Sequence, residues 1–465
     1  MLTLTYPPTY KPERLYIYDF VLRSFLGLSY HHQVGLPGEV TISLRGDAEK
    51  RRLRLDDTLF SIPQDHWLTS AVTPKQPLET ILAHEVDLDF DWINSSLPVL
   101  FGSRLSNGEF YQSSEDGIDL GIDVFGSAFF LLTRYEEVIS PARDSHDRFP
   151  AKASSGVQQG FLDRPIVNET IEFLWACLHK MWPRLERAPR SFSTILGHDV
   201  DIPLIAGGAT WLEIARGMAG DFLKRRDLSM AAGRLRSLVE NRRGNLDADL
   251  WNTFGFLLET SERKGLPSTF FFISGHSGGK IDGTYSLEDP WIRSLLQEIG
   301  QRGHQIGLHP SYNTFLDQDL LGKEFRRLQE TAKSVGLQQA KWGGRQHFLR
   351  WRAPTTWQLY ENVGLAFDAT LTYPDRPGFR SGICDPYPVF NLQTRQPLEL
   401  IEQPLIVMDE AFLGKGSFSI HSVKDSMVRF KDLCKHVNGV FSLLWHNGWL
   451  ISKKARTLYL ELLEA

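Results

Sequence analysis

The sequence has no long apolar run, little cysteine and only a small net charge. No segment reaches the roughly 18 apolar residues that a membrane-spanning helix requires, and the N-terminus lacks the basic and apolar stretches of a signal peptide. The three cysteines, Cys177, Cys384 and Cys434, lie far apart, so they form neither a disulfide framework nor a paired-cysteine metal site. These absences predict a cytoplasmic protein whose cysteines are reduced core residues.

The net charge of −5 over 465 residues excludes one broad class of partner. Nucleic-acid-binding proteins usually carry a marked basic excess, so no nucleic-acid partner is expected. The remaining composition, with 42% hydrophobic and 23% charged residues, is that of an ordinary globular protein. The length allows two or three domains with sizeable cores.

The prolines and arginines of residues 182–192 mark the strongest candidate for a domain boundary. Residues 1–188 mix strand-like and helix-like segments, which predicts a smaller α+β domain. Residues 189–465 instead alternate short apolar runs, such as Ser193–Leu196 and Thr269–Ser274, with longer helical patterns. This alternation predicts an α/β domain with a parallel sheet, either open or closed into a barrel.

A basic insert follows the first predicted strand of the C-terminal domain. Residues 204–249 separate that strand from its helix, and seven lysines and arginines lie between Lys224 and Arg243. Such a segment is either a solvated amphipathic helix or a basic cover that contacts an acidic polymer or an anionic membrane. Peripheral membrane contact through residues 222–243 is therefore one hypothesis for this insert.

Two aspartates close the first predicted strand of the same domain. Asp199 and Asp201 are two residues apart, so a strand directs both side chains to one face. Two neighbouring carboxylates do not easily both stay ionised unless a cation or a proton lies between them. One carboxylate as a metal ligand and the other as a base is a common arrangement. The alternative is that Asp201 caps the next element ahead of Pro203.

Histidines end two further predicted strands. His309 closes a strand that begins after Gly303, and Asn313 follows at a spacing that puts both side chains on one face of a helical turn. His446 interrupts the apolar run Val440–Leu450 and suits a general acid or base, because the ordinary pKa of histidine is about 6.5. Each histidine could instead be a structural residue that bonds to a backbone carbonyl.

Five motifs in order make residues 193–450 resemble the polysaccharide deacetylases, the NodB-like carbohydrate esterases. That family has a strand-end motif with two acidic residues, an H-[ST]-x-x-H motif, an arginine motif, a second acidic motif and a late L-x-H motif. The corresponding strings here are HDVD (198–201), GHQIGLHPSYN (303–313), RQHFLRWRAP (345–354), FDAT (367–370) and LLWH (443–446). The resemblance implies an incomplete (β/α) barrel for residues 189–465.

Two further strings, FGSAFFLLTRYEE (125–137) and DATLTYPDRPGFRSG (368–382), look like a branch of this family that carries an extra N-terminal domain. That branch is associated with bacterial surface polysaccharide synthesis. The resemblance therefore implies an N-acetylated carbohydrate as substrate, either a surface polysaccharide or its precursor.

The resemblance also implies a role for each motif residue. Asp199 is the general base, and His446 is the acid that protonates the leaving amine. Asp201 and His309 are ligands of a divalent metal, expected to be Zn²⁺. Arg345 and Asp368 orient the base and the acid.

The third metal ligand is where this sequence departs from the family, which has histidine at the position of Asn313. An amide oxygen is a poorer zinc ligand than imidazole. Either Asn313 binds weakly as the third ligand, or another group such as His304 or His347 takes its place, or the metal is lost. His304 corresponds to a histidine that is not a ligand in the family.

The predicted function is metal-dependent hydrolysis of an N-acetyl group on a carbohydrate. The main alternative is a catalytically decayed barrel that binds carbohydrate or acts as a scaffold, and Asn313 favours it. Retention of Asp199, Asp201 and His446 favours the enzyme. A third alternative is hydrolysis of a non-sugar C–N bond on the same fold.

Overall fold

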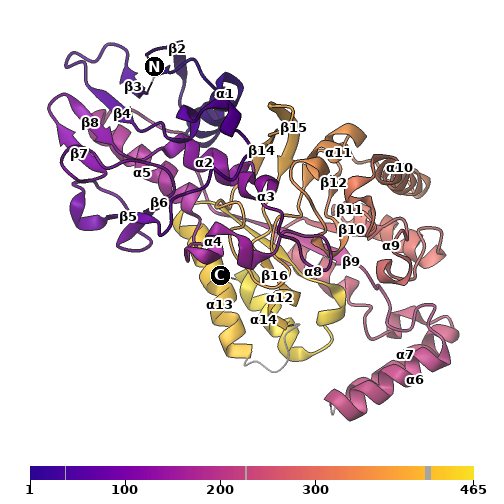
Figure 1. Ribbon diagram of the computed structural model, residues 1–465. Coiled ribbons are helices and arrows are strands. Elements are labelled where there is room, and N and C mark those ends of the chain that lie inside the picture. The colour runs from indigo at the N-terminus through magenta and orange to yellow at the C-terminus, as the bar shows by residue number, and fades with distance from the viewer. Residues whose placement is uncertain (37, 226–227, 414–419, 465) are drawn as a thin grey trace.

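The computed structural model describes residues 1–36, 38–225, 228–413 and 420–464 (Figure 1). Its N-terminal part is built on a six-stranded mixed sheet with the strand order β2-β1-β3-β4-β8-β7. The bounds of these strands are β1 Leu2–Tyr6, β2 Tyr30–Val34, β3 Val40–Leu44, β4 Arg52–Leu55, β7 Tyr111–Ser114 and β8 Gly117–Leu120. A separate antiparallel pair consists of β5 Glu79–Leu82 and β6 Ser96–Val99.

The two longest helices of the N-terminal part, α2 and α5, are mostly apolar and pack into the core. Every residue of α2, with the sequence VFGSAFFLL, is buried. The α-helices here are α1 Lys11–Tyr18, α2 Val124–Leu132, α3 Tyr135–Ile139, α4 Ser155–Gln158 and α5 Ile166–Met181.

A second sheet of nine strands begins at residue 193, in the order β14-β15-β13-β12-β11-β10-β9-β17-β16. All neighbouring pairs are parallel except β14 with β15. The strands are β9 Ser193–Val200, β10 Ser268–Ile273, β11 Gln305–His309, β12 Gly343–Gly344, β13 Phe367–Asp368, β14 Tyr387–Asn391, β15 Gln396–Glu402, β16 Val407–Met408 and β17 Val440–Leu444.

Amphipathic helices follow the parallel strands and lie outside the sheet (Figure 1). The helices are α8 Phe254–Arg263, α9 Pro290–Gln301, α10 Gln318–Ser334, α11 Thr355–Val363, α12 Asp409–Leu413, α13 Ile420–His436 and α14 Lys453–Glu464. This strand–helix alternation confirms the predicted α/β class. Curvature into an incomplete barrel and the domain boundary at residue 188 remain predictions.

The basic insert forms two helices, α6 Trp211–Gly220 and α7 Leu228–Arg242, which pack on each other and project from the body of the molecule (Figure 1). Arg226 and Asp227 of this insert lie outside the described residues. Several large apolar side chains of the insert are exposed: Trp211, Leu212, Phe222, Leu223 and Leu228. In the described part of the chain, we find no helix with both the length and the apolarity needed to cross a membrane.

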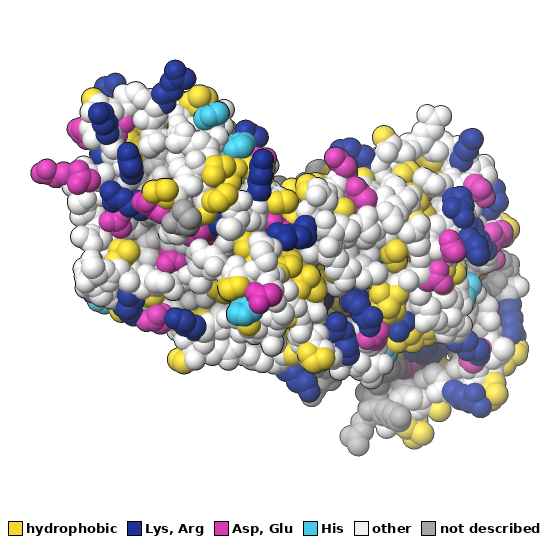
Figure 2. Space-filling view, turned by 45° about the horizontal axis from the view of Figure 1, so that its top comes forward, with side chains coloured by type: hydrophobic (Ala, Val, Ile, Leu, Met, Phe, Trp, Pro, Cys, Tyr) yellow, Lys and Arg dark blue, Asp and Glu magenta, His cyan; other side chains and the backbone are white. Residues whose placement is uncertain are grey.

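The N-terminal part and the nine-stranded sheet share one continuous hydrophobic core. The ring of Phe390 in β14 lies 5.0 Å from Tyr16 of α1 and 5.3 Å from Phe129 of α2. Arg380 donates two hydrogen bonds to the buried carboxylate of Glu137. On the face seen in Figure 2, basic and acidic side chains are interspersed over both parts.

Candidate metal centre

Four of the polar residues singled out in the sequence lie at the carboxyl ends of parallel strands of the same sheet. Asp199 lies in β9 and Asp201 follows it, His309 ends β11, and His446 follows β17. The β9–β10–β11 register aligns Asp199 with Phe271 and His309 with Ile273. Ligand and catalytic sites of parallel α/β folds lie at this edge, because the strand ends converge there and the following loops supply side chains.

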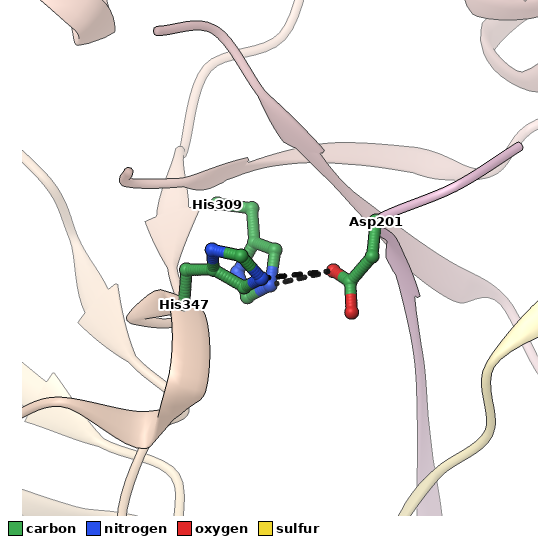
Figure 3. Close-up of side chains that lie close together, drawn as sticks. All are labelled: Asp201, His309 and His347. Carbon is green, nitrogen blue, oxygen red and sulfur yellow. Dashed lines mark ion pairs between the residues drawn. The ribbon is translucent and has the colours of Figure 1, made fainter. Parts of the chain in front are cut away.

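Asp201, His309 and His347 form a cluster whose ligand-type atoms all lie within 4.8 Å of one another. Figure 3 shows both imidazole rings facing the same carboxylate oxygen of Asp201. Asp201 Oδ1 lies 3.0 Å from Nε2 of His309 and 3.9 Å from Nε2 of His347. Two nitrogens and one oxygen from three separate segments of the chain therefore point to a common centre.

The other ring nitrogen of His309 and of His347, Nδ1, already has a hydrogen-bond partner. His309 Nδ1 lies 2.5 Å from the carbonyl oxygen of Arg345, and His347 Nδ1 lies 2.8 Å from Oδ1 of Asp282. Both partners are acceptors, so each Nδ1 carries the proton and each Nε2 has a free lone pair in the neutral ring. Such second contacts orient metal-binding histidines and fix their tautomer.

These facing lone pairs fit a divalent cation. Asp201 Oδ1 is buried and has no partner with hydrogen-bond geometry among the described residues. An acceptor oxygen 3.0 Å from an acceptor nitrogen is unfavourable unless a proton or a cation lies between them. One carboxylate and two imidazoles are a familiar donor set for Zn²⁺.

The pKa shifts of His309 and Asp201 also favour a cation at this cluster. Burial lowers the pKa of His309, but the carboxylates of Asp199 and Asp201 outweigh burial, and the pKa is raised above its ordinary value. Burial raises the pKa of Asp201, but His309, His347 and His446 together outweigh burial, so this pKa is lowered. A field that draws a proton onto a buried imidazole also attracts a metal cation.

Asn313, predicted as the third ligand, lies outside this cluster. Its Nδ2 donates to the carbonyl oxygen of Ser277, and its Oδ1 accepts from Arg350 at 2.8 Å. The amide oxygen of this exposed residue therefore already accepts a hydrogen bond from the Arg350 guanidinium. His347, one of the two alternatives weighed from the sequence, takes the third place, while Nδ1 of His304 accepts from the backbone N–H of Ser268.

Asp199, the predicted base, forms a buried ion pair with Arg345, whose Nη1 lies 2.7 Å from Oδ1. Gly197, on the same strand face as Asp199, leaves room for this guanidinium. A Cβ at Gly197 would lie 2.7 Å from Nη2 of Arg345. Arg345 also donates from Nε to the carbonyl oxygen of Ala369 and packs over the Phe271 ring. These contacts hold Asp199 in one orientation beside the cluster, with Oδ2 3.7 Å from His309 Nε2.

His446, the predicted acid, is oriented by Asp409, the first residue of α12. Asp409 Oδ1 lies 2.7 Å from Nδ1 of His446, and Nε2 of His446 lies 3.7 Å from Oδ2 of Asp201. Burial lowers the pKa of His446, but the carboxylates of Asp409 and Asp201 outweigh it and raise the pKa to about 10. In this environment His446 is an imidazolium with a proton available at Nε2.

Asp368, predicted to orient the catalytic pair, does not bond to Asp199 or His446 in the described structure. Its Oδ1 accepts from the backbone N–H and hydroxyl of Thr370. Burial raises the pKa of Asp368 to about 7. The carboxylate that orients the His446 ring is therefore Asp409. The strand-end position of Asp409, directly after the apolar run Leu405–Met408, is the sequence signal that would have found it.

Asp199, Asp201, His309, His347 and His446 line a cavity of about 410 Å³ at the strand ends. The cavity wall also includes Leu349 and Met408 and two residues of the N-terminal part, His146 and Arg148. A larger cavity of about 600 Å³ lies between α5 and the end of α13 and contains none of the clustered residues.

Comparisons with known proteins give a partial match. Residues 3–183 match a family described as of unknown function, DUF7033. No curated protein matches the chain.

Three solved structures match part of the chain at low similarity. A Mycobacterium smegmatis protein assigned to the polysaccharide deacetylases has 16% identity and a TM-score of 0.37, covering 59% of this chain and 83% of its own. Bacillus subtilis PdaA, a family 4 carbohydrate esterase, has 12% identity, a TM-score of 0.26 and coverages of 44% and 64%. PuuE allantoinase has 14% identity, a TM-score of 0.35 and coverages of 60% and 87%. These values are too low to transfer an activity.

Proposed function

We propose that this chain is a metal-dependent carbohydrate N-deacetylase. The observation that carries the proposal is one cavity that holds a carboxylate–imidazole cluster together with a candidate proton acceptor, Asp199, and a candidate proton donor, His446. Asp199 is paired with an arginine, and His446 is paired with Asp409. A hydrolase needs one group to accept a proton from water and another to donate a proton to the leaving amine.

The metal ligands in this proposal are Asp201, His309 and His347. A divalent ion held there, which we propose to be Zn²⁺, would polarise the amide carbonyl and lower the pKa of an attacking water. The Arg345 guanidinium holds the Asp199 carboxylate in position to accept a proton. His446 holds its proton at Nε2, which faces the cluster, and donates it to the departing sugar amine.

The cavity wall suits an N-acetyl group. Leu349 and Met408 give an apolar surface beside the charged cluster, and the small methyl of an acetyl group gains by burial against such a surface. The five sequence motifs support a carbohydrate as the carrier of this group. A bacterial surface polysaccharide or its precursor is the substrate we propose.

Peripheral membrane contact through residues 222–243 is part of this proposal. Phe222, Leu223 and Leu228 are exposed, and seven lysines and arginines lie between Lys224 and Arg243. Apolar and basic side chains together bind anionic lipid surfaces. Replacement of Phe222 and Leu223 by serine should abolish co-sedimentation with anionic vesicles. Equal co-sedimentation of this variant and the wild type would contradict the membrane contact.

The experiment that tests the enzyme is release of acetate from N-acetylated sugar polymers and oligosaccharides, with added Zn²⁺, Mn²⁺ or Co²⁺. Asp199→Asn and His446→Ala should retain the metal while turnover falls about 10²- to 10⁴-fold. Asp201→Ala should lose metal and activity together, because it removes a ligand.

The rival function is a decayed barrel that binds carbohydrate without hydrolysis. It predicts no acetate with any metal, and equal carbohydrate affinity for wild type and Asp199→Asn. A panel of small non-sugar amides in the same assay distinguishes the third alternative, hydrolysis of another C–N bond.

A further inference from the structure

The turn that carries His347 has an unfavourable backbone conformation. The two residues after His347 are Phe348 and Leu349, with φ angles of 60° and 53°. Bulky residues rarely adopt this left-handed region, because their Cβ atoms crowd the backbone. Such conformations persist only where surrounding contacts hold them, and they concentrate at functional sites.

The contacts that hold this turn come in large part from the N-terminal part of the chain. Arg148 Nη1 donates to the carbonyl oxygen of Phe348 at 2.7 Å. The ring of His146 packs on the Phe348 ring at 5.1 Å between centroids, and Phe348 in turn packs on His347 at 4.8 Å. A chain of contacts therefore runs from residues 146–148 to the imidazole of the cluster.

Two arginines beyond the turn attach it to the same segment. Arg350 Nε donates to the carbonyl oxygen of His146 at 2.9 Å, and Arg352 pairs with Asp147 at 2.5 Å. Arg350 also donates to Oδ1 of Asn313. The residue at the family's third-ligand position thus supports the loop that supplies a ligand in its place.

The segment Asp144–Arg148 is itself braced, so it can act as a support. Asp144 Oδ1 accepts from the backbone N–H groups of His146 and Arg148, and Oδ2 accepts from Nε of Arg148 at 2.8 Å. This carboxylate fixes the Arg148 guanidinium with Nη1 directed at Phe348. The side chain of Arg148 is only 13% exposed.

We propose that residues 144–148 of the N-terminal part are positioning residues of the metal centre, which hold the left-handed turn at 348–349 so that His347 completes the ligand set. The N-terminal part is then a component of the site, and the ion's affinity depends on it. This inference rests on the proposed function only in that Asp201, His309 and His347 bind a divalent ion.

The test is the dissociation constant of Zn²⁺ or Co²⁺ for the full chain, measured by competition with a chelator. Arg148→Met removes the hydrogen bond to Phe348 and should weaken the affinity about 10- to 100-fold, as loss of outer contacts does at other metal centres. Asp147→Asn is a milder second variant in case Arg148→Met fails to fold. Arg429→Met is the control, because Arg429 pairs with a different residue of the N-terminal part, Asp163.

A second substitution separates positioning from a general loss of structure. Glycine adopts positive φ without penalty, so Phe348→Gly should reduce the need for the support. In the Phe348→Gly background, Arg148→Met should cost less than about threefold in affinity. The visible absorption of the Co²⁺ form, which reports ligand geometry, should change in Arg148→Met and remain unchanged in Arg429→Met.

The outcomes are distinguishable. If the wild type binds an ion and both Arg148→Met and Asp147→Asn bind it equally tightly, the positioning role is wrong while the metal centre stands. If the loss in Arg148→Met is the same with glycine or phenylalanine at 348, the held turn is not the cause, and the inference is also wrong. If the wild type binds no ion, the proposed metal centre fails and this inference fails with it.

Discussion

Asp409 binds His446 at two points, through Oδ1 to the ring nitrogen Nδ1 at 2.7 Å and through Oδ2 to the backbone N–H at 2.6 Å. Asp409 is fully buried, and the contact spans 37 residues of sequence. The pair sets both the tautomer of His446 and the affinity of the ring for a proton. The charge of Asp409 is therefore the feature to remove if His446 is the acid.

Asp409→Asn should move the alkaline limit of activity to lower pH. An acid must be protonated, so turnover falls as the pH rises through its pKa. Loss of the Asp409 carboxylate removes a main cause of the raised pKa of His446, and the limit should fall with that pKa. The measurement is kcat against pH with metal saturating. An alkaline limit identical to that of the wild type would show that His446 is not the acid.

His347→Ala and Asn313→Ala should differ sharply in metal affinity. His347 contributes a ligand in our proposal, so its loss should weaken Zn²⁺ binding by about 100-fold or more, above the range for outer contacts. Asn313→Ala should change the affinity by less than about threefold, because Arg350 keeps its bonds to Tyr312 and His146. Chelator competition measures both. A larger loss of affinity in Asn313→Ala than in His347→Ala would mean that Asn313 is the third ligand.

Gly197→Ala should lower turnover without loss of metal. The added Cβ would lie 2.7–2.8 Å from the two terminal nitrogens of Arg345, which is only 1% exposed and cannot move without leaving Asp199. The expected fall in kcat is about 10- to 100-fold, a part of what a general base contributes. Gly255→Ala is the control, because a Cβ at that exposed helical site meets nothing within 4 Å. Unchanged kcat in Gly197→Ala would mean that the Arg345–Asp199 pair is dispensable.

Glu324→Gln should stabilise the protein at neutral and alkaline pH but not at acidic pH. Burial raises the pKa of Glu324 to about 7 from its ordinary 4.5, so folding favours the neutral carboxyl. The stability that this group contributes is fully present below pH 4.5 and is lost as the pH rises through 7. The variant should match the wild type near pH 4 and exceed its free energy of unfolding by roughly 3 kcal/mol near pH 9.

Urea unfolding at these two pH values tests this expectation. Glu330→Gln is the matched control, since Glu330 is exposed on the same helix, α10. A gain for Glu324→Gln that is equal at both pH values would mean that ionisation of the carboxyl is not its cause.

The sequence by itself determined the local features of this protein. Alternating apolar runs and helical patterns predict the parallel strands and their helices, since both depend on spacing within a short segment. The same logic finds Asp199, Asp201, His309 and His446, because each ends a strand, and strand ends of a parallel sheet meet at one edge.

Only the tertiary structure shows which of several nearby side chains lie together in the proposed site. Asn313 and His347 both follow strand ends, and spacing alone does not show that Arg350 occupies the amide of Asn313 while Asp282 turns His347 toward Asp201. Asp409 reaches His446 because β16 and β17 pair, which depends on how the sheet assembles. The contact of Arg148 with Phe348 is even harder to predict from the sequence, since it spans 200 residues and depends on how the two parts of the chain pack.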